Sequence, residues 1–133
     1  MKRIFRIARL EDRTLLDRGL AREFGERALK PDGFVHLSFA EQIRGTLETH
    51  FGDARELALL EIDGERTRGA RRFELSRGRR DLPHLYRALE PADIVREWRV
   101  AKSGNAFELP EIASGPEFDR QPGPPRSLAT FGA

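Results

Sequence analysis

Cysteine is absent from this chain, which excludes disulfide bonds, thiolate metal ligands and a cysteine nucleophile. No apolar run in the sequence approaches the roughly 20 residues that a membrane-spanning helix needs. The N-terminal stretch is basic and lacks the apolar core of a secretory signal. We therefore expect a cytoplasmic protein without a membrane partner.

Three common enzyme signatures are missing as well. The chain has neither a phosphate-binding loop nor a dinucleotide-binding glycine pattern. It also lacks the serine elbow of acyl-transfer enzymes. Any nucleotide site must therefore be built in another way.

Lysine is rare, since Lys2, Lys30 and Lys102 are the only lysines among 24 basic residues. Arginine binds planar oxyanions through two parallel N–H groups, whereas lysine acts as a point charge. The arginine excess is therefore compatible with an oxyanion ligand, but codon bias in a GC-rich genome is the explanation that we favour. The net charge of only +2 argues against bulk nucleic-acid binding.

The length of 133 residues fits one domain with its own core. We assign a single α+β domain to residues 1–102. Residues 103–133 are a Pro- and Gly-rich C-terminal extension with isolated aromatic residues. This extension has no apolar pattern of its own, so we expect it to be partly irregular.

Hydrophobic patterning predicts the elements of the first half. Residues 3–9 alternate as a strand, and residues 10–20 form an amphipathic helix with acids in its first turn. Residues 21–30 are polar and weakly patterned, which predicts a loop or a single helical turn. A turn signal then precedes a short strand at residues 34–37.

Ser38 and Glu41 form a capping-box pattern, so Ser38 should begin a helix. The apolar residues of this helix recur every four positions and should form its buried stripe. They are Phe39, Ile43, Leu47 and Phe51.

The second half is richer in strands. Residues 57–62 begin as a continuous apolar run, which predicts a central strand covered on both faces. Further strands are predicted at residues 71–75, 82–86 and 94–102. This order predicts an α+β fold with a small mixed or split β-sheet and about two helices.

The stretch from residue 32 to residue 38 is the chemical centre of this interpretation. Side chains alternate along a strand, so His36 and Ser38 should point the same way, and Phe34 with them. Imidazole exchanges protons near neutral pH, which makes His36 a candidate catalytic residue. The alternative is a half-buried structural histidine. Ser38 is a candidate ligand-binding hydroxyl, and the alternative is a helix cap.

His84 and Tyr86 also lie two residues apart, on another short strand. If the two histidine strands are neighbours, His36, His84 and Tyr86 line one pocket, with His84 as a second catalytic candidate and Tyr86 as a ligand-binding ring. Arg77 precedes Gly78 in a basic loop and is the candidate ligand for an oxyanion. Two histidines without a constrained acid are a poor ligand set, so we predict no metal site.

The order and spacing of three segments resemble the small bacterial family catalogued as domain of unknown function nine-fifty-two. They are the N-terminal strand, DGFVHLS at residues 32–38, and LPHLY at residues 82–86 preceded by FELSRG at residues 73–78. The resemblance covers residues 3–102. It implies a fold similar to the ADP-ribosyltransferase-like superfamily, a split β-sheet core that binds the nicotinamide dinucleotide NAD in its cleft. It implies no reaction, because the family has no assigned one.

The resemblance also implies residue roles. In the superfamily a strand histidine bonds the adenosine ribose and a hydroxyl two residues later bonds the nicotinamide-side ribose, positions that His36 and Ser38 match. Tyr86 resembles the tyrosine that stacks on nicotinamide. Two departures stand out: Leu37 replaces a usual glycine, and Glu97 is the only acid inside the late strand that should carry a catalytic glutamate.

Two hypotheses of different class follow. The first is a cleft that binds NAD or an ADP-ribose-bearing ligand, with ADP-ribosyl transfer or cleavage as its reaction. The alternative is a non-enzymatic module that binds an anionic small molecule or an RNA end through residues 66–87, which hold eight arginines. Aromatic residues are sparse there, so base stacking has little support. A third hypothesis is acid–base chemistry by His36 and His84 on a small metabolite.

Overall fold

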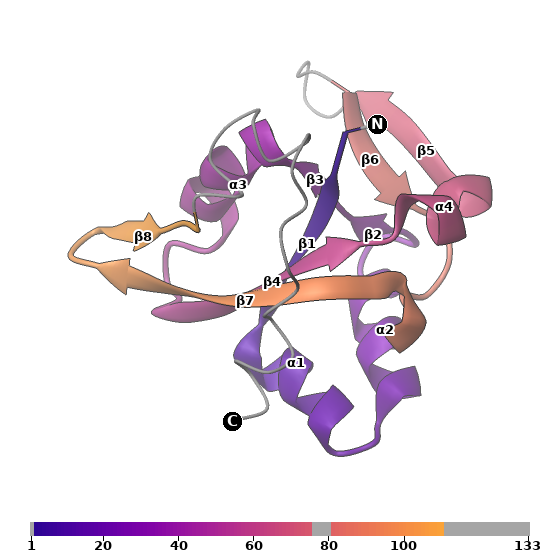
Figure 1. The fold of residues 1–133 in the computed structure, drawn as a ribbon, viewed down its shortest axis with the longest axis horizontal. Helices are drawn as coiled ribbons and strands as arrows, with labels where there is room; N and C mark the ends of the chain where they lie inside the picture. Colours follow the sequence, from indigo (N-terminus) through magenta and orange to yellow (C-terminus); the bar gives the residue numbers. More distant parts are fainter. Residues whose placement is uncertain (1, 76–80, 111–133) are drawn as a thin grey trace.

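Two antiparallel β-sheets form the framework of the protein (Figure 1). The computed structural model describes residues 2–75 and 81–110. A five-stranded sheet has the order β3-β1-β4-β7-β8, with the bounds Ser38–Phe39, Ile4–Arg9, Glu56–Ile62, Ile94–Ser103 and Ala106–Glu108. A three-stranded sheet has the order β2-β6-β5, with the bounds Val35–His36, Asp81–Leu85 and Arg71–Leu75.

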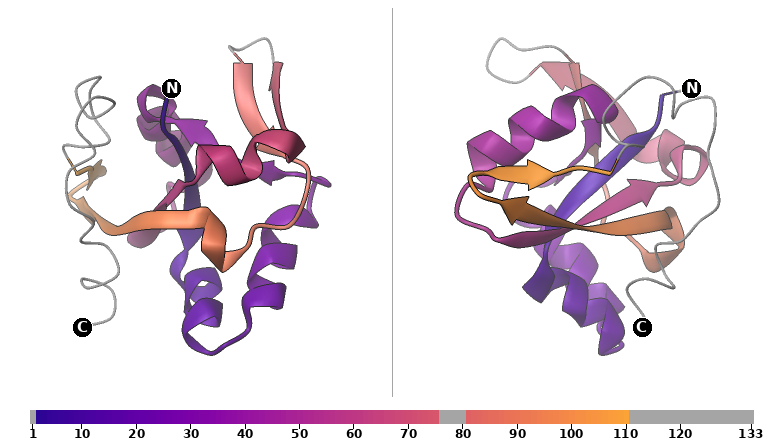
Figure 2. Two further views of the ribbon diagram at one scale, coloured as in Figure 1. Left: turned by 45° about the vertical axis from the view of Figure 1, so that its right-hand side comes forward. Right: turned by 60° about the vertical axis from the view of Figure 1, so that its left-hand side comes forward.

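Four α-helices occur in the described ranges: α1 (Leu10–Asp17), α2 (Ala21–Leu29), α3 (Ile43–His50) and α4 (Gly64–Thr67). Figures 1 and 2 show α1, α2 and the three-stranded sheet on one side of the five-stranded sheet and α3 on the other. Within these ranges no helix has the length and apolar character to cross a membrane. The architecture is α+β, as predicted.

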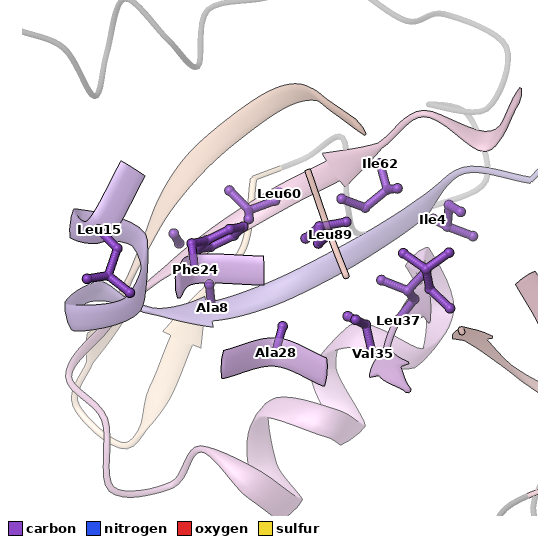
Figure 3. Close-up of a cluster of buried hydrophobic side chains, with 12 residues drawn as sticks. Ile4, Ala8, Leu15, Phe24, Ala28, Val35, Leu37, Leu60, Ile62 and Leu89 are labelled. Carbon is purple, nitrogen blue, oxygen red and sulfur yellow. The ribbon is translucent and has the colours of Figure 1, made fainter. Parts of the chain in front are cut away.

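Each face of the five-stranded sheet carries one hydrophobic cluster, and β4 contributes to both. The first cluster contains the buried residues Ile4, Ala8, Leu15, Phe24, Ala28, Val35, Leu37, Ala58, Leu60, Ile62, Leu85 and Leu89 (Figure 3). The second contains Phe5, Ile7, Ile43, Leu47, Leu57, Leu59, Val100 and Phe107. Strand β4 is buried along its whole length after Glu56, which confirms the predicted central strand.

Residues 21–30 form helix α2, so the prediction of a loop or a single turn was wrong. The buried face of α2 consists of Phe24, Gly25 and Ala28, and only the first is a large apolar residue. A Cβ on Gly25 would lie 2.4 Å from the carbonyl oxygen of Leu89. Helix α2 therefore packs closely against the backbone at Leu89. Hydrophobic periodicity does not detect such a contact, because it depends on a missing side chain. This helix and the short α4 raise the number of helices above the two that were predicted.

Ser38 does not cap a helix, contrary to the prediction. It lies in β3, and a 3₁₀ turn at Ala40–Gln42 separates it from α3. The N–H of Phe39 donates instead to the side-chain amide oxygen of Gln42 (2.9 Å). Ile43 of the predicted stripe is fully buried in the second cluster. Phe39, the first residue of the predicted stripe, lies in β3 and packs against the first cluster. The stripe therefore predicted the helix correctly only from Ile43 onwards.

The five-stranded sheet continues past residue 102, where the predicted domain ends. Strand β8 pairs with the end of β7 and places Phe107 in the second cluster. The tail of the predicted extension, from residue 111 onwards, lies outside the described residues.

A buried carboxylate joins α4 to the segment between β6 and β7. Asp93 accepts hydrogen bonds from Nε of Arg66 (3.0 Å), from both Nη atoms of Arg87 (2.8 and 3.0 Å) and from the N–H of Glu90 (2.8 Å). Burial acts to raise the pKa of Asp93, but the bonds from Arg87, Glu90 and Arg66 outweigh it and hold this pKa below its usual range. These two arginines therefore have a structural role.

Replacing Gly25 by Ala should lower the free energy of unfolding by roughly 1–3 kcal/mol, because the new Cβ would overlap the carbonyl of Leu89. The matched control is Gly45→Ala in α3, where a Cβ meets nothing within 4 Å. There the helix propensity of Ala should stabilise the protein by roughly 0.5–1 kcal/mol. Urea unfolding measures both values. A stabilised Gly25→Ala variant would contradict the close packing of α2.

Replacing Asp93 by Asn should weaken the fold at neutral pH and flatten its acid dependence. Because the folded pKa is depressed, ionised Asp93 stabilises the fold above the unfolded value of about 3.9, and this stabilisation is lost as the pH falls through the folded pKa. The expected loss at neutral pH is roughly 1–3 kcal/mol. Urea unfolding at a series of pH values tests this, and an unchanged acid limb in the variant would refute it.

Candidate functional site

The pairing of β2 with β6 brings the two predicted histidines together. His36 lies opposite His84, and Val35 lies opposite Leu85. The N–H of Leu37 donates to the carbonyl of Pro83 (3.0 Å). Since hydrogen-bonded and non-bonded pairs alternate in an antiparallel ladder, the two histidines form a non-bonded pair, in which side chains lie closest. Their ring centroids are 5.2 Å apart.

Four rings gather on this face of the three-stranded sheet, and we call them the ring cluster: Phe34, His36, His84 and Tyr86. The ring of Phe34 is stacked on His84 at 4.0 Å, and it lies 4.7 Å from His36 and 5.3 Å from Tyr86. Phe34 is therefore the centre of the cluster. Alternation along the strand predicted that it shares the face of His36, whereas its stacking on His84 was not predicted.

The members of the ring cluster differ sharply in exposure. His84 is only 4% exposed, whereas Tyr86 is 40% exposed and the side chain of His36 is 54% exposed. Phe34 stacks on the ring of His84. The accessible part of the cluster is therefore formed by Phe34, His36 and Tyr86, and His84 supports them from below.

A carboxylate lies beside the exposed histidine. Nε2 of His36 is 2.7 Å from Oδ2 of Asp32, and both side chains are about half exposed. Gly33, with a φ of +82°, makes the turn that brings the two side chains together. A hydrogen bond to one ring nitrogen determines which nitrogen carries the proton. Asp32 and His36 thus form an oriented acid–base pair at the edge of the ring cluster.

Arg72 adds a positive charge to the same face. It lies opposite His84 in the pairing of β5 with β6, and its guanidinium carbon is 5.8 Å from the ring centroid of Tyr86. The sequence interpretation did not single out Arg72, and only the strand register reveals its place. The predicted oxyanion ligand, Arg77, lies outside the described residues.

Ser38 does not share the face of His36, so that prediction was wrong. The chain leaves the three-stranded sheet after His36 and enters the five-stranded sheet at Ser38, which interrupts the alternation of one strand. Ser38 is buried, and its hydroxyl lies 3.4 Å from the hydroxyl of Thr46. The structure therefore separates this hydroxyl from the accessible rings.

Glu97, the only acidic residue of β7, forms an ion pair. Glu97 is buried in β7, and its two oxygens accept from Nε (2.5 Å) and Nη2 (2.9 Å) of Arg13. The hydrogen bond with Glu97 raises the pKa of Arg13. This geometry is that of a structural pair between α1 and the sheet.

At least three of the eight arginines in the stretch at residues 66–87 make internal contacts. Arg66 and Arg87 bind Asp93, as described above, and Arg71 donates to Thr67 Oγ1 (2.7 Å) and to a backbone carbonyl. Within residues 2–75 and 81–110, no group of three His, Asp or Glu side chains is placed to hold a metal ion. The ring cluster with Asp32 and Arg72 is therefore the candidate site.

Comparisons with known proteins support this architecture. A family model described as protein of unknown function (DUF952) matches residues 11–97. The chain is similar to protein CC0527 from Caulobacter crescentus, whose X-ray structure is 29% identical, has a TM-score of 0.66, and aligns over 80% of this chain and 94% of that one. The solution NMR structure of CC0527 gives 29% identity and a TM-score of 0.63 over 80% and 91% of the two chains. No curated protein matches this chain. The chain belongs to the DUF952 family of proteins of unknown function.

Proposed function

We propose that the ring cluster binds NAD or another ADP-ribose-bearing ligand. The observation that carries this proposal is the convergence of exposed His36 and Tyr86 around Phe34, with Arg72 at the same face. Planar rings beside a guanidinium suit a ligand that joins an aromatic base to a phosphate. The resemblance to the ADP-ribosyltransferase-like superfamily supports the same ligand, because His36 and Tyr86 resemble two residues of its motif.

Each exposed group has a role in this proposal. Tyr86 and Phe34 stack on the nicotinamide or adenine ring, a contact worth on the order of 1 kcal/mol. Arg72, close to the Tyr86 ring, neutralises a phosphate. His36, oriented by Asp32, bonds a ribose hydroxyl. The residues present therefore fit the binding of a nucleotide by its ring, sugar and charge.

The reaction within this proposal is ADP-ribosyl transfer or cleavage. Loss of nicotinamide leaves a positive charge on the ribose, and a nearby carboxylate stabilises such a charge. Glu97 is paired with Arg13 and does not serve this purpose. Asp32 is the carboxylate that lies beside the ring cluster, in contact with His36. We therefore propose binding as the primary function and assign the carboxylate role to Asp32.

The alternative functions have weaker support. An RNA-binding module would use residues 66–87, but Arg66, Arg71 and Arg87 already make internal contacts. Acid–base chemistry by two histidines would need both rings to reach a substrate, and His84 is buried under Phe34. In the ring cluster, by contrast, the side chains of His36 and Tyr86 are exposed and can reach a ligand.

The proposal is tested by calorimetric titration of the protein with NAD, ADP-ribose and nicotinamide. We expect saturable binding of NAD or ADP-ribose by the parent protein. His36→Ala should weaken it by about tenfold or more, the value of one hydrogen bond and one ring contact. His50→Ala is the matched control, because His50 is exposed at the end of α3 and should leave the affinity unchanged.

The outcome that would refute the proposal is the absence of heat with all three ligands while circular dichroism shows a folded protein. Titration with a short single-stranded RNA at two salt concentrations then tests the alternative. A steep fall in RNA affinity with salt would favour the arginine-rich module.

A further inference from the structure

Arg6 is a charged residue on an apolar face. Side chains alternate along β1, so Arg6 shares a face with Ile4 and Ala8, both of which belong to the first cluster. Its partner across the sheet is Leu60, which is fully buried in the same cluster. Arg6 itself remains partly exposed. A cation at such a position requires a compensating interaction.

Three other arginines in or beside the five-stranded sheet form salt bridges that compensate for their burial. Arg3 and Arg96 both contact the carboxylate of Glu61, at 2.6 and 3.0 Å. Arg13, which packs against the sheet from α1, holds both oxygens of Glu97. Each of these cations has a carboxylate within salt-bridge distance.

Arg6 differs from them. The difference is the carboxylate, because in the described part of the chain none lies within salt-bridge distance of Arg6. The Nε of Arg6 is also buried and has no hydrogen-bond partner. Its Nη1 donates to the backbone carbonyl of His36 (3.1 Å). Burial lowers the pKa of Arg6 to about 10, and the charge of Asp12 offsets this only in part. Asp12 itself accepts from Arg27 at 2.9 Å.

The contact with His36 places this guanidinium at the candidate site. Because Leu37 N–H bonds the carbonyl of Pro83, the alternation of the ladder leaves the His36 carbonyl pointing away from β6, towards the open edge of β2. Arg6 reaches from the five-stranded sheet to that edge. It therefore contacts the backbone of the residue whose ring joins the ring cluster.

We propose that Arg6 is an anion-binding residue that holds the phosphate or pyrophosphate of the ligand at the open edge of β2. The identity of the ligand as a nucleotide rests on the proposed function, whereas the anion contact stands on the geometry of Arg6 alone. Arg72 and Arg6 then approach the ligand from two sides, one beside Tyr86 and one beside the backbone of His36. A guanidinium matches phosphate oxygens through paired N–H donors.

Two probes separate the anion contact from ring stacking: sodium pyrophosphate, which has no ring, and adenosine, which has no phosphate. Thermal unfolding at constant ionic strength is measured for the parent and for Arg6→Gln. Pyrophosphate should raise the Tm of the parent, because a ligand that binds only the folded state stabilises it. It should leave the Tm of Arg6→Gln unchanged. Adenosine should bind both proteins equally in calorimetry.

The matched control is Arg9→Gln, which removes an arginine from the same strand. Arg9 already contacts Asp53 and lies over the ring of Phe51, so its variant should respond to pyrophosphate as the parent does. Without ligand, Arg6→Gln should be at least as stable as the parent, because it removes a desolvated charge that has no carboxylate partner. For ADP-ribose, the affinity of Arg6→Gln should fall roughly tenfold or more, as expected when a charge-assisted contact is lost.

The outcomes separate the two proposals. An equal rise in Tm for the parent and Arg6→Gln, or no rise in the parent, would overturn the anion contact. A rise that is confined to the parent and Arg9→Gln, without any binding of NAD, ADP-ribose or adenosine, would support the anion contact and refute the proposed function. Should Arg6→Gln fail to fold, Arg6→Lys takes its place. A lysine should retain part of the pyrophosphate response, and a full response would contradict the paired-donor contact.

Discussion

Leu37 donates its N–H to the carbonyl of Pro83, and this bond sets the register of β2 against β6. In that register Val35 and Leu85 turn into the first cluster, while His36 and His84 turn outwards. A slip of β2 by one residue would turn Val35 outwards and His36 towards the first cluster. The burial of Val35 and Leu85 therefore holds the two histidines together. The candidate site is a consequence of core packing on the other side of the same strands.

The placement of charges explains part of the unusual composition. Buried acids occur on the five-stranded sheet and beside it, and arginine is their partner in each of the pairs formed by Glu61, Glu97 and Asp93. Arginine is suited to this role because its planar group donates several hydrogen bonds at once. The arginine content, for which codon bias and an oxyanion ligand were the two explanations, thus has a further, internal cause. Only arginines without such an internal acid, such as Arg6, still point to a ligand.

Sequence reasoning succeeded where a local pattern and the tertiary contact agree. The strand at residues 57–62 was predictable because burial on both faces leaves a continuous apolar run. Helix α2 was not, because its decisive contact is the missing side chain of Gly25 against a distant backbone. The prediction that Ser38 begins a helix was wrong for a related reason. The capping pattern of Ser38 is local, whereas its actual place in β3 depends on pairing with Phe5 of β1, far earlier in the chain.

The site could be predicted only in part for the same physical reason. Alternation along two strands placed His36, His84 and Tyr86 on common faces, and the strand pairing joined those faces. The position of Arg72 depends on the register of β5, which no local pattern reveals. The burial of His84 depends on how the ring of Phe34 packs.

That packing changes what the second histidine contributes. The ring of His84 is buried and does not form part of the accessible surface, but Phe34 stacks on it. Phe34 in turn contacts His36 and Tyr86, so each ring restricts the rotation of its neighbours. Rings that are already held in place lose little conformational freedom when a ligand stacks on them. His84 therefore supports the ring surface at which the exposed His36 would contact a ligand.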